Sequence, residues 1–273
     1  MALLVALATP QTAFVRVADI PYAQGPRGKL DVYRPRAPHP GAPVVVFFYG
    51  GNWQGGDKAL YRFVGASLAA RGMVVVIPDY RVYPQVRFPA FLEDNARAVR
   101  WTFDHAAGYG GDPGKLFLMG HSAGAYEAAM LALEPRWLAD VGLRSDRDVR
   151  GLIGLSGPYD FLPLHSETLK AIFGPPETLP ATQPINHVDG RGPPALLMAG
   201  SADRTVRPSN SQNLADRIRQ RGGAAEMVIF PKVGHARTIT DLLPLVGGAL
   251  GVRGRILAFI AARSAVSPAR AVA

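Results

Sequence analysis

A serine between two glycines, placed where an apolar run gives way to helix-forming residues, most constrains the fold of this chain. Residues 115–119 are mostly apolar, residues 120–124 read Gly-His-Ser-Ala-Gly, and residues that favour helices follow. This order predicts a buried strand, a sharp turn and a helix. The turn strains the backbone at the serine, and its neighbours two positions away must be small so that strand and helix pack closely. We interpret Ser122 as a nucleophile held clear of a sheet; a plain tight turn is the alternative.

The composition is that of a globular protein that can bury a large core. Of the 273 residues, 48% are hydrophobic and 19% are charged, and this length suits a single α/β domain. The chain has no cysteine, which excludes disulfides, thiolate zinc sites and a cysteine nucleophile. The six histidines are scattered without a His-x-x-x-His pair, so we expect neither a metal site nor a cofactor.

The formal net charge of +9 raises the question of nucleic acid, but the arginines are spread along the chain and nucleic acid is not an expected partner. Residues 1–13 resemble the end of a secretory signal, yet they lack a positively charged start and are too short to span a bilayer. We therefore expect no stable membrane anchoring. A cytoplasmic enzyme with an apolar N-terminal arm is favoured, and a secreted or periplasmic enzyme whose signal ends there is the alternative.

Apolar runs alternate with helix-like segments along the chain. This is the pattern of a mostly parallel, doubly wound α/β sheet with helices on both faces. Runs typical of strands cover residues 30–34, 44–49, 74–78, 116–119, 151–155, 195–199 and 227–230. Segments typical of helices cover residues 58–70, 89–105, 209–221 and 244–263.

Residues 161–194 break this alternation. They contain many prolines and one weak helix, at residues 166–173, and we expect them to form a small cap over the carboxyl edge of the sheet. The sequence therefore predicts a single α/β domain over residues 14–263, preceded by the arm at 1–13 and followed by a frayed tail at 264–273.

A serine hydroxyl needs a base within hydrogen-bond reach, and a carboxylate must orient that base. In hydrolases with this kind of turn, the acid and then the histidine follow the serine on loops after strands. Asp203 follows the run at 195–199 and His235 follows the run at 227–230. We predict His235 as the general base and Asp203 as its orienting acid, with Asp160, after an earlier strand, as the alternative acid. The other histidines suit the role less well, because they precede the sheet, end a helix, adjoin the serine or lie in the cap.

An oxyanion needs two or three N–H donors about 3 Å from the developing charge. The N–H of Ala123, directly after the serine, is one candidate. Residues 49–53 follow a predicted strand and read Tyr-Gly-Gly-Asn-Trp, and the glycines allow the backbone to approach a substrate closely. We predict that the N–H groups of Gly51 and Asn52 complete the oxyanion hole; an ordinary glycine turn is the alternative.

Together these motifs resemble the esterases of the α/β-hydrolase fold that carry a His-Gly-Gly-x oxyanion motif, the hormone-sensitive-lipase-like and kynurenine-formamidase-like branch. That branch also contains acetyl-xylan and feruloyl esterase-like members. The resemblance spans residues 28–262 and is carried by the stretches at 30–35, 49–58, 79–94, 111–113, 120–124 and 156–160. The chain departs from the family motif at Tyr49, where the family has a histidine that orders the loop.

The resemblance implies an α/β-hydrolase fold with a small cap. It also implies a serine hydrolase that cleaves carboxylic esters of small to medium acyl or aromatic acids through Ser122, His235, Asp203 and an acyl-enzyme. An arylformamidase that cleaves an N-formyl aromatic amide with the same residues is the close alternative. A third is a non-catalytic protein that binds a ligand in the same cleft.

Three aromatic residues are candidates for the substrate pocket: Trp53, Tyr126 and Phe161. Core packing is the alternative interpretation of each. We expect a small-molecule ester as the partner, and a monomer or homodimer as the assembly.

Overall fold

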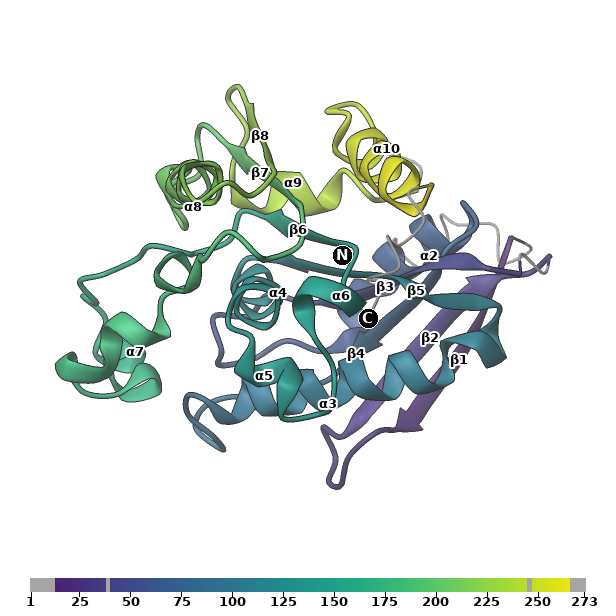
Figure 1. The fold of residues 1–273 in the computed structure, drawn as a ribbon, viewed down its shortest axis with the longest axis horizontal. Coiled ribbons are helices and arrows are strands. Elements are labelled where there is room, and N and C mark those ends of the chain that lie inside the picture. The colour runs from purple at the N-terminus through teal and green to yellow at the C-terminus, as the bar shows by residue number, and fades with distance from the viewer. Residues whose placement is uncertain (1–12, 38–39, 245–246, 266–273) are drawn as a thin grey trace, which may run out of the picture.

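The computed structural model describes residues 13–37, 40–244 and 247–265. The arm expected at residues 1–13 and the tail expected at 264–273 lie almost wholly outside these ranges. The described residues form a sheet of eight strands in the order β1-β2-β4-β3-β5-β6-β7-β8 (Figure 1). β1 pairs antiparallel with β2, β2 pairs antiparallel with β4, and the other neighbouring pairs are parallel. This confirms the mostly parallel sheet predicted from the sequence.

The strands, in chain order, are β1 (Phe14–Pro21), β2 (Lys29–Pro35), β3 (Ala42–Phe48), β4 (Val74–Pro78), β5 (Gly111–His121), β6 (Gly151–Leu155), β7 (Ala195–Gly200) and β8 (Ala225–Phe230). The α-helices are α2 (Arg62–Ala69), α3 (Ala90–His105), α4 (Ala123–Leu133), α5 (Arg136–Ala139), α6 (Ser145–Asp148), α7 (Glu167–Phe173), α8 (Ser209–Gln220), α9 (His235–Thr240) and α10 (Val252–Ser264). Short 3-10 helices are η1 (Lys58–Tyr61), η2 (Ala106–Tyr109), η3 (Pro176–Thr182) and η4 (Pro184–His187).

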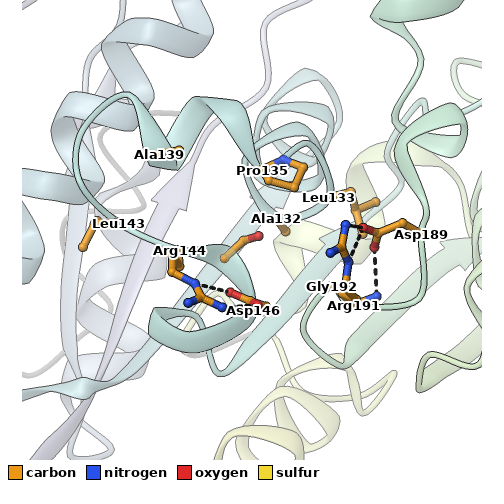
Figure 2. A pocket seen from close by; sticks show the side chains of 11 residues that line it. Ala132, Leu133, Pro135, Ala139, Leu143, Arg144, Asp146, Asp189, Arg191 and Gly192 are labelled. Atoms are coloured by element: carbon orange, nitrogen blue, oxygen red, sulfur yellow. Dashed lines mark hydrogen bonds and ion pairs between the residues drawn. The ribbon is translucent and has the colours of Figure 1, made fainter. Parts of the chain in front are cut away.

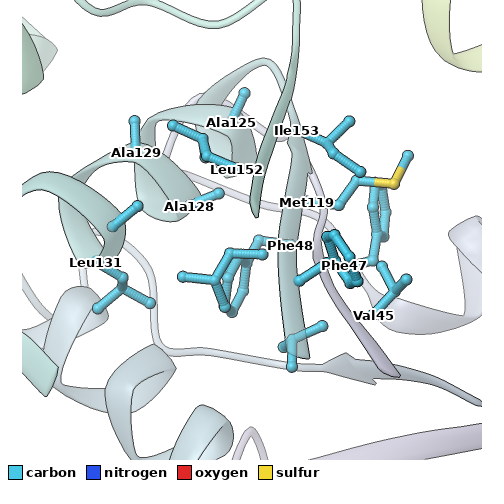
Figure 3. Packing of buried hydrophobic residues seen from close by; sticks show 14 of the residues in the cluster. Val45, Phe47, Phe48, Met119, Ala125, Ala128, Ala129, Leu131, Leu152 and Ile153 are labelled. Carbon is cyan, nitrogen blue, oxygen red and sulfur yellow. The ribbon is translucent and has the colours of Figure 1, made fainter. Parts of the chain in front are cut away.

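The middle strands are apolar in consecutive positions because helices cover both faces of the sheet, and every residue of β4 and β6 is buried. Figure 3 shows the alternation: Phe48 lies on the side of α4, whereas its neighbour Phe47 points to the opposite face with Met119. The face of α4 toward the sheet carries alanines, which let the helix lie close to the strands. This close packing sets the position of the turn that joins β5 to α4.

One strand was missed by the sequence analysis, and one predicted helix has a different start. β1 was not predicted, because this half-exposed edge strand mixes apolar residues with Arg16 and Asp19 and has no continuous apolar run. The helix predicted at 244–263 begins only at Val252 as α10, because Gly248 and Gly251 have positive φ angles of 94° and 80° that a helix cannot contain. The other predicted strands and helices are present, with ends that shift by a few residues.

Residues 161–194 contain α7, η3 and η4. α7 stands away from the sheet at one side of the molecule (Figure 1). It contacts the body of the protein through the carbonyl of Ile172, which accepts the N–H of Phe88 at 2.9 Å, and through the ring of Phe173, which packs on Phe88 and Phe91. The role of this segment as a cap over substrate stays a prediction.

Candidate active site

Ser122 occupies the turn between β5 and α4. Its φ and ψ are 55° and −126°, a strained backbone conformation for a residue with a side chain. Strand and helix approach closely here: a Cβ atom on Gly120 would overlap the carbonyl of Gly124, and one on Gly124 would overlap the carbonyl of Phe48. The small residues that the sequence analysis required on both sides of the serine are therefore needed for this packing.

Three side chains far apart in the sequence form a row of hydrogen bonds at this turn. The Oγ atom of Ser122 lies 2.8 Å from Nε2 of His235, and Nδ1 of His235 lies 2.7 Å from Oδ2 of Asp203. The buried carboxylate of Asp203 accepts the ring N–H at Nδ1, which leaves the lone pair of Nε2 facing the serine hydroxyl. A base in this state can take the hydroxyl proton as the oxygen attacks an electrophile.

The loop after β7 holds the Asp203 carboxylate in place. Its Oδ1 atom accepts the backbone N–H groups of Thr205 and Val206, each at 2.9 Å, while Oδ2 faces the imidazole. The alternative acid, Asp160, lies elsewhere: its Oδ2 atom accepts the side-chain amide of Asn213 on α8 at 2.7 Å. Of the two candidate acids, Asp203 is the one whose carboxylate contacts His235.

His235 is the first residue of α9, and two groups hold its backbone. Thr238 Oγ1 donates to the His235 carbonyl at 3.0 Å, and Nε2 of His121 lies 3.3 Å from the same oxygen. Burial lowers the pKa of His121 to about 3, so this neighbouring ring stays neutral and its Nε2–H is available to the carbonyl. The supporting contact of His121 was not predicted, because the sequence does not show that α9 returns to the turn.

The residues 49–56, here called the oxyanion loop, lie against the serine. A Cβ atom on Gly50 would be only 2.9 Å from Cβ of Ser122, so only glycine allows this approach. The loop continues through Asn52 and Trp53 with positive φ angles of 55° and 57°. Ala123, the first residue of α4, has an N–H with no acceptor inside its helix. The loop and the start of α4 thus meet at Ser122, and the roles of the Gly51, Asn52 and Ala123 N–H groups stay a prediction.

Tyr49, which stands where the resembled family has histidine, anchors the first end of the oxyanion loop. Its side chain is fully buried, and its hydroxyl donates to Oδ1 of Asp79 at 2.9 Å and accepts from Arg27 at 2.9 Å. Burial raises the pKa of this hydroxyl, so it keeps its proton and remains a donor. Arg27 also donates to the carbonyl of Gly56 at 2.8 Å, which joins the two ends of the loop.

The three aromatic candidates for a substrate pocket are packed together. The ring of Trp53 lies 5.1 Å from that of Tyr126 and 6.0 Å from that of Phe161, and Phe173 of α7 contacts all three. Trp53 and Tyr126 are buried, whereas Phe161 is partly exposed. Core packing therefore accounts for the first two rings, and binding of substrate by any of the three stays a prediction.

Glu127 is a buried residue of this region that sequence reasoning missed. It lies on α4, and its carboxyl accepts the indole N–H of Trp53 at 2.9 Å and the side-chain amide of Asn95 at 3.1 Å. The signal was present, since Glu127 is the one charged residue in the otherwise apolar α4. A lone acid in an apolar helix indicates a buried polar partner.

A cavity of about 220 Å³ lies elsewhere, between the end of α4, α5, α6 and residues 189–192 (Figure 2). Its charged side chains are paired with one another, Arg144 with Asp146 and Arg191 with Asp189. None of the residues of the hydrogen-bonded row lines it. Across the described ranges, no three side chains of the metal-ligating types gather at one point, and no helix is long and apolar enough to cross a membrane.

Comparison with known proteins agrees with this fold. The model of the BD-FAE family matches residues 30–218. The chain belongs to the BD-FAE family. Its matching relatives are named as esterases, a methylesterase and a formamidase, and its fold is the α/β-hydrolase fold of the matching esterase structures.

Two curated relatives and one solved structure illustrate the match of this BD-FAE protein. It is 31% identical over 254 residues to the probable isoprenylcysteine alpha-carbonyl methylesterase ICMEL1 of Arabidopsis thaliana, covering 84% of this chain and 52% of that one. It is 34% identical over 149 residues to the kynurenine formamidase of Danio rerio, covering 54% of this chain and 48% of that one. The chain thus spans about half the length of these curated relatives. The butyrate-bound esterase 2 of Thermogutta terrifontis matches with a TM-score of 0.75 and 26% identity, over 92% of this chain and 95% of that one.

Proposed function

We propose that this BD-FAE protein hydrolyses carboxylic esters of small to medium acyl or aromatic acids, with Ser122 as nucleophile, His235 as general base and Asp203 as the acid that orients it. The observation that carries the proposal is the row of two hydrogen bonds, of 2.8 Å and 2.7 Å, from the hydroxyl through the imidazole to the carboxylate. Family membership and the esterase names of the relatives support the reaction class.

In the proposed reaction, Oγ of Ser122 attacks the ester carbonyl while Nε2 of His235 takes the hydroxyl proton. Asp203 stabilises the imidazolium that results. The oxyanion accepts hydrogen bonds from the N–H groups of Ala123, Gly51 and Asn52, all of which carry no formal charge and need no reorganisation. The imidazolium then protonates the leaving alcohol, and a water repeats the attack on the acyl-enzyme to release the acid and the free serine.

The rate of this reaction should rise with pH, because only a neutral imidazole can accept the proton of the serine. His121, which adjoins it, stays neutral over this range because its pKa is about 3. A flat profile of kcat/KM between pH 5 and 8, with chemistry shown to be rate-limiting, would count against His235 as the base.

An arylformamidase is the second candidate. It is favoured by the match to the kynurenine formamidase of Danio rerio, which is 34% identical over 149 residues. The same three residues would attack the formyl carbon and protonate the leaving aromatic amine. The two candidates separate when kcat/KM is measured for p-nitrophenyl acetate, p-nitrophenyl butyrate and N-formylkynurenine with one preparation.

A fluorophosphonate probe tests whether Ser122 is activated at all. We expect stoichiometric labelling of Ser122 in the wild-type protein and none in Ser122→Ala, because an unactivated serine does not react with the probe. Absence of labelling in folded wild-type protein, together with no turnover of any ester or formamide, would favour a non-catalytic protein that binds a ligand in the cleft.

A further inference from the structure

We propose that Glu127 is a positioning residue for the oxyanion loop: its carboxyl ties the indole of Trp53 to α4 and so holds the N–H groups of Gly51 and Asn52 toward Ser122. The inference rests on the proposed function, because the loop matters for rate only if it binds an oxyanion. It assigns a role to a buried acid that neither the hydrogen-bonded row nor the core requires.

The position of Glu127 suits this role. It lies on α4, the helix whose first residue is Ala123, so one rigid element carries the serine turn, one predicted donor and the anchor for the loop. Oε1 of Glu127 accepts the indole N–H of Trp53 at 2.9 Å, and Oε2 accepts the amide of Asn95 on α3 at 3.1 Å. The bond to Trp53 therefore fixes the loop relative to the serine through a single intervening helix.

The oxyanion loop needs such an anchor because its conformation is costly. Asn52 and Trp53 both have positive φ angles, which residues with bulky side chains rarely adopt. A strained conformation persists only where the surrounding structure holds it. The carbonyl of Trp53 accepts the N–H of Tyr83 at 2.8 Å, and the ring of Trp53 packs on Tyr126. The bond from its indole N–H to Glu127 holds the far end of the side chain in place.

The groups around the Glu127 carboxyl favour its neutral form. It is fully buried, and its bonded partners are the neutral donors Trp53 and Asn95. The other groups that interact with it electrostatically are the hydroxyls of Tyr80 and Tyr126 and, on α3, the carboxylate of Asp94. Two cations of this region are committed elsewhere, since they both pair with that same aspartate: Arg81 and Arg97. Burial raises the pKa of Glu127 to about 8. Near neutral pH the loop is thus anchored by an uncharged acid.

Two substitutions separate a positioning role from core packing. Glu127→Gln has the same shape and keeps an acceptor for Trp53, but it cannot ionise. Its side-chain N–H can donate to Asn95 once the Asn95 amide turns to present Oδ1, an atom that has no hydrogen-bond partner in the wild type. Glu127→Leu fills a similar volume and removes both bonds. Glu134→Gln, the same chemical change near the end of α4 on a partly exposed acid that pairs with His187, is the matched control.

The first measurement is steady-state hydrolysis of p-nitrophenyl butyrate at pH 7. We expect Glu127→Leu to lower kcat by about 10- to 100-fold with little change in KM, less than the full loss of one oxyanion donor, because the loop donors move out of line. Glu127→Gln should keep more than about a third of the wild-type kcat, and Glu134→Gln should match the wild type. A folded Glu127→Leu protein with wild-type kcat would overturn the proposal, and so would an equal loss in the Gln and Leu variants.

The second measurement is the alkaline limb of kcat. Above about pH 8 the wild-type kcat should fall, because ionised Glu127 adds an unpaired buried negative charge to the helix and loop that bind the oxyanion, whereas the Glu127→Gln profile should stay level. A purely structural role would leave the two profiles alike. Identical alkaline limbs would overturn the neutral-acid part of the proposal.

The third measurement does not need turnover. Amide hydrogen exchange over residues 49–56 should be faster in Glu127→Leu than in the wild type and in Glu127→Gln, because the loop loses its anchor. Failure of the wild type to hydrolyse any ester would remove the proposed function while exchange still decides the anchor. Unchanged exchange in Glu127→Leu, in a protein that melts like the wild type, would remove the anchor instead.

Discussion

Two buried carboxylates of this protein, Asp203 and Asp31, have side chains with no exposed surface and opposite kinds of partners. Asp203 accepts two backbone N–H groups and the ring of His235. Asp31, on β2, accepts Nε of Arg16 at 2.8 Å and lies 3.3 Å from the ammonium of Lys58. The first group is here called the serine cluster, with Ser122, and the second the Asp31 cluster, with Asp79.

The difference lies in whether the partner of the carboxylate can change its charge. Arg16 and Lys58 are charged throughout the neutral pH range, so the ion pairs of Asp31 are already formed before any ligand binds. In the proposed reaction His235 takes the serine proton, so the attraction of Asp203 for the imidazole grows as the reaction proceeds. Under the proposed function, buried acids of the same type thus stabilise the fold in the Asp31 cluster and a transition state in the serine cluster.

The two clusters also differ in what they hold still. Asp79 belongs to the Asp31 cluster and reaches the oxyanion loop, because its Oδ1 accepts the hydroxyl of Tyr49 and the backbone N–H of Lys58, each at 2.9 Å. Burial raises the pKa of Asp79, and these donors oppose that effect. The Asp31 cluster therefore supports the oxyanion loop through the bond from Tyr49 to Asp79, whereas the serine cluster contacts the loop where Gly50 lies against Ser122.

The largest expected effect is at the nucleophile. Ser122→Ala should lower kcat by about 10⁴- to 10⁶-fold, because no other hydroxyl can replace the attacking oxygen. Thermal unfolding should be unchanged, since Ser122 is partly exposed. Hydrolysis of p-nitrophenyl acetate and a melting curve measure both, with Ser67→Ala, which removes a buried hydroxyl on α2, as the control for losing a serine. Turnover retained in Ser122→Ala would place the chemistry outside the serine cluster.

Asp203→Asn should lower kcat by about 10³- to 10⁴-fold, because an amide cannot stabilise the imidazolium or enforce the tautomer that leaves Nε2 free. The matched control is Asp160→Asn, the same change at the alternative acid, which should keep the wild-type kcat because Asp160 bonds Asn213 instead. If Asp160→Asn lost activity and Asp203→Asn kept it, the assignment of Asp203 as the orienting acid would be wrong. Circular dichroism and a denaturant curve check that both remain folded.

Asp31→Asn tests whether the Asp31 cluster contributes to stability and not to the rate. It removes the charge shared by Arg16 and Lys58, and we expect the free energy of unfolding to fall by about 3 kcal/mol, measured by urea denaturation. The kcat of the folded variant should match the wild type, because the Asp31 cluster takes no part in proton transfer. A loss of rate larger than tenfold at unchanged stability would show that the two clusters are not separate.

Tyr49→Phe should have the smallest effect. It removes the hydroxyl that links Arg27 to Asp79, leaving both with one partner fewer, so the free energy of unfolding should fall by about 1–2 kcal/mol. The kcat should fall only several-fold, because the backbone of the oxyanion loop keeps its contact with Ser122. Tyr49→His, which restores the residue of the resembled family motif, tests whether an imidazole can take over the link. A Tyr49→Phe protein as inactive as Ser122→Ala would make Tyr49 part of the reaction.

The local sequence pattern was sufficient to predict those elements whose conformation depends on neighbouring residues in the chain. The turn at Ser122 needs small residues at Gly120 and Gly124, so five consecutive positions are enough to predict its geometry. β4 and β6 are continuous apolar runs, and their bounds matched the prediction. The order of serine, acid and histidine along the chain, each after a strand, was enough to nominate the three residues that the structure joins by hydrogen bonds.

Only the tertiary structure decided the features that depend on distant partners. β1 is held as a strand by its pairing with β2 and not by its own apolar content. A lone acid in an apolar helix indicates that Glu127 has a buried polar partner, but only the structure shows that Trp53 and Asn95, from two other segments, are the residues that bond it. The same holds for Tyr49, whose hydroxyl acquires its task from Arg27 and Asp79. Burial and pairing set the energy of a polar group, and both are created by residues far away in the chain, which no local pattern contains.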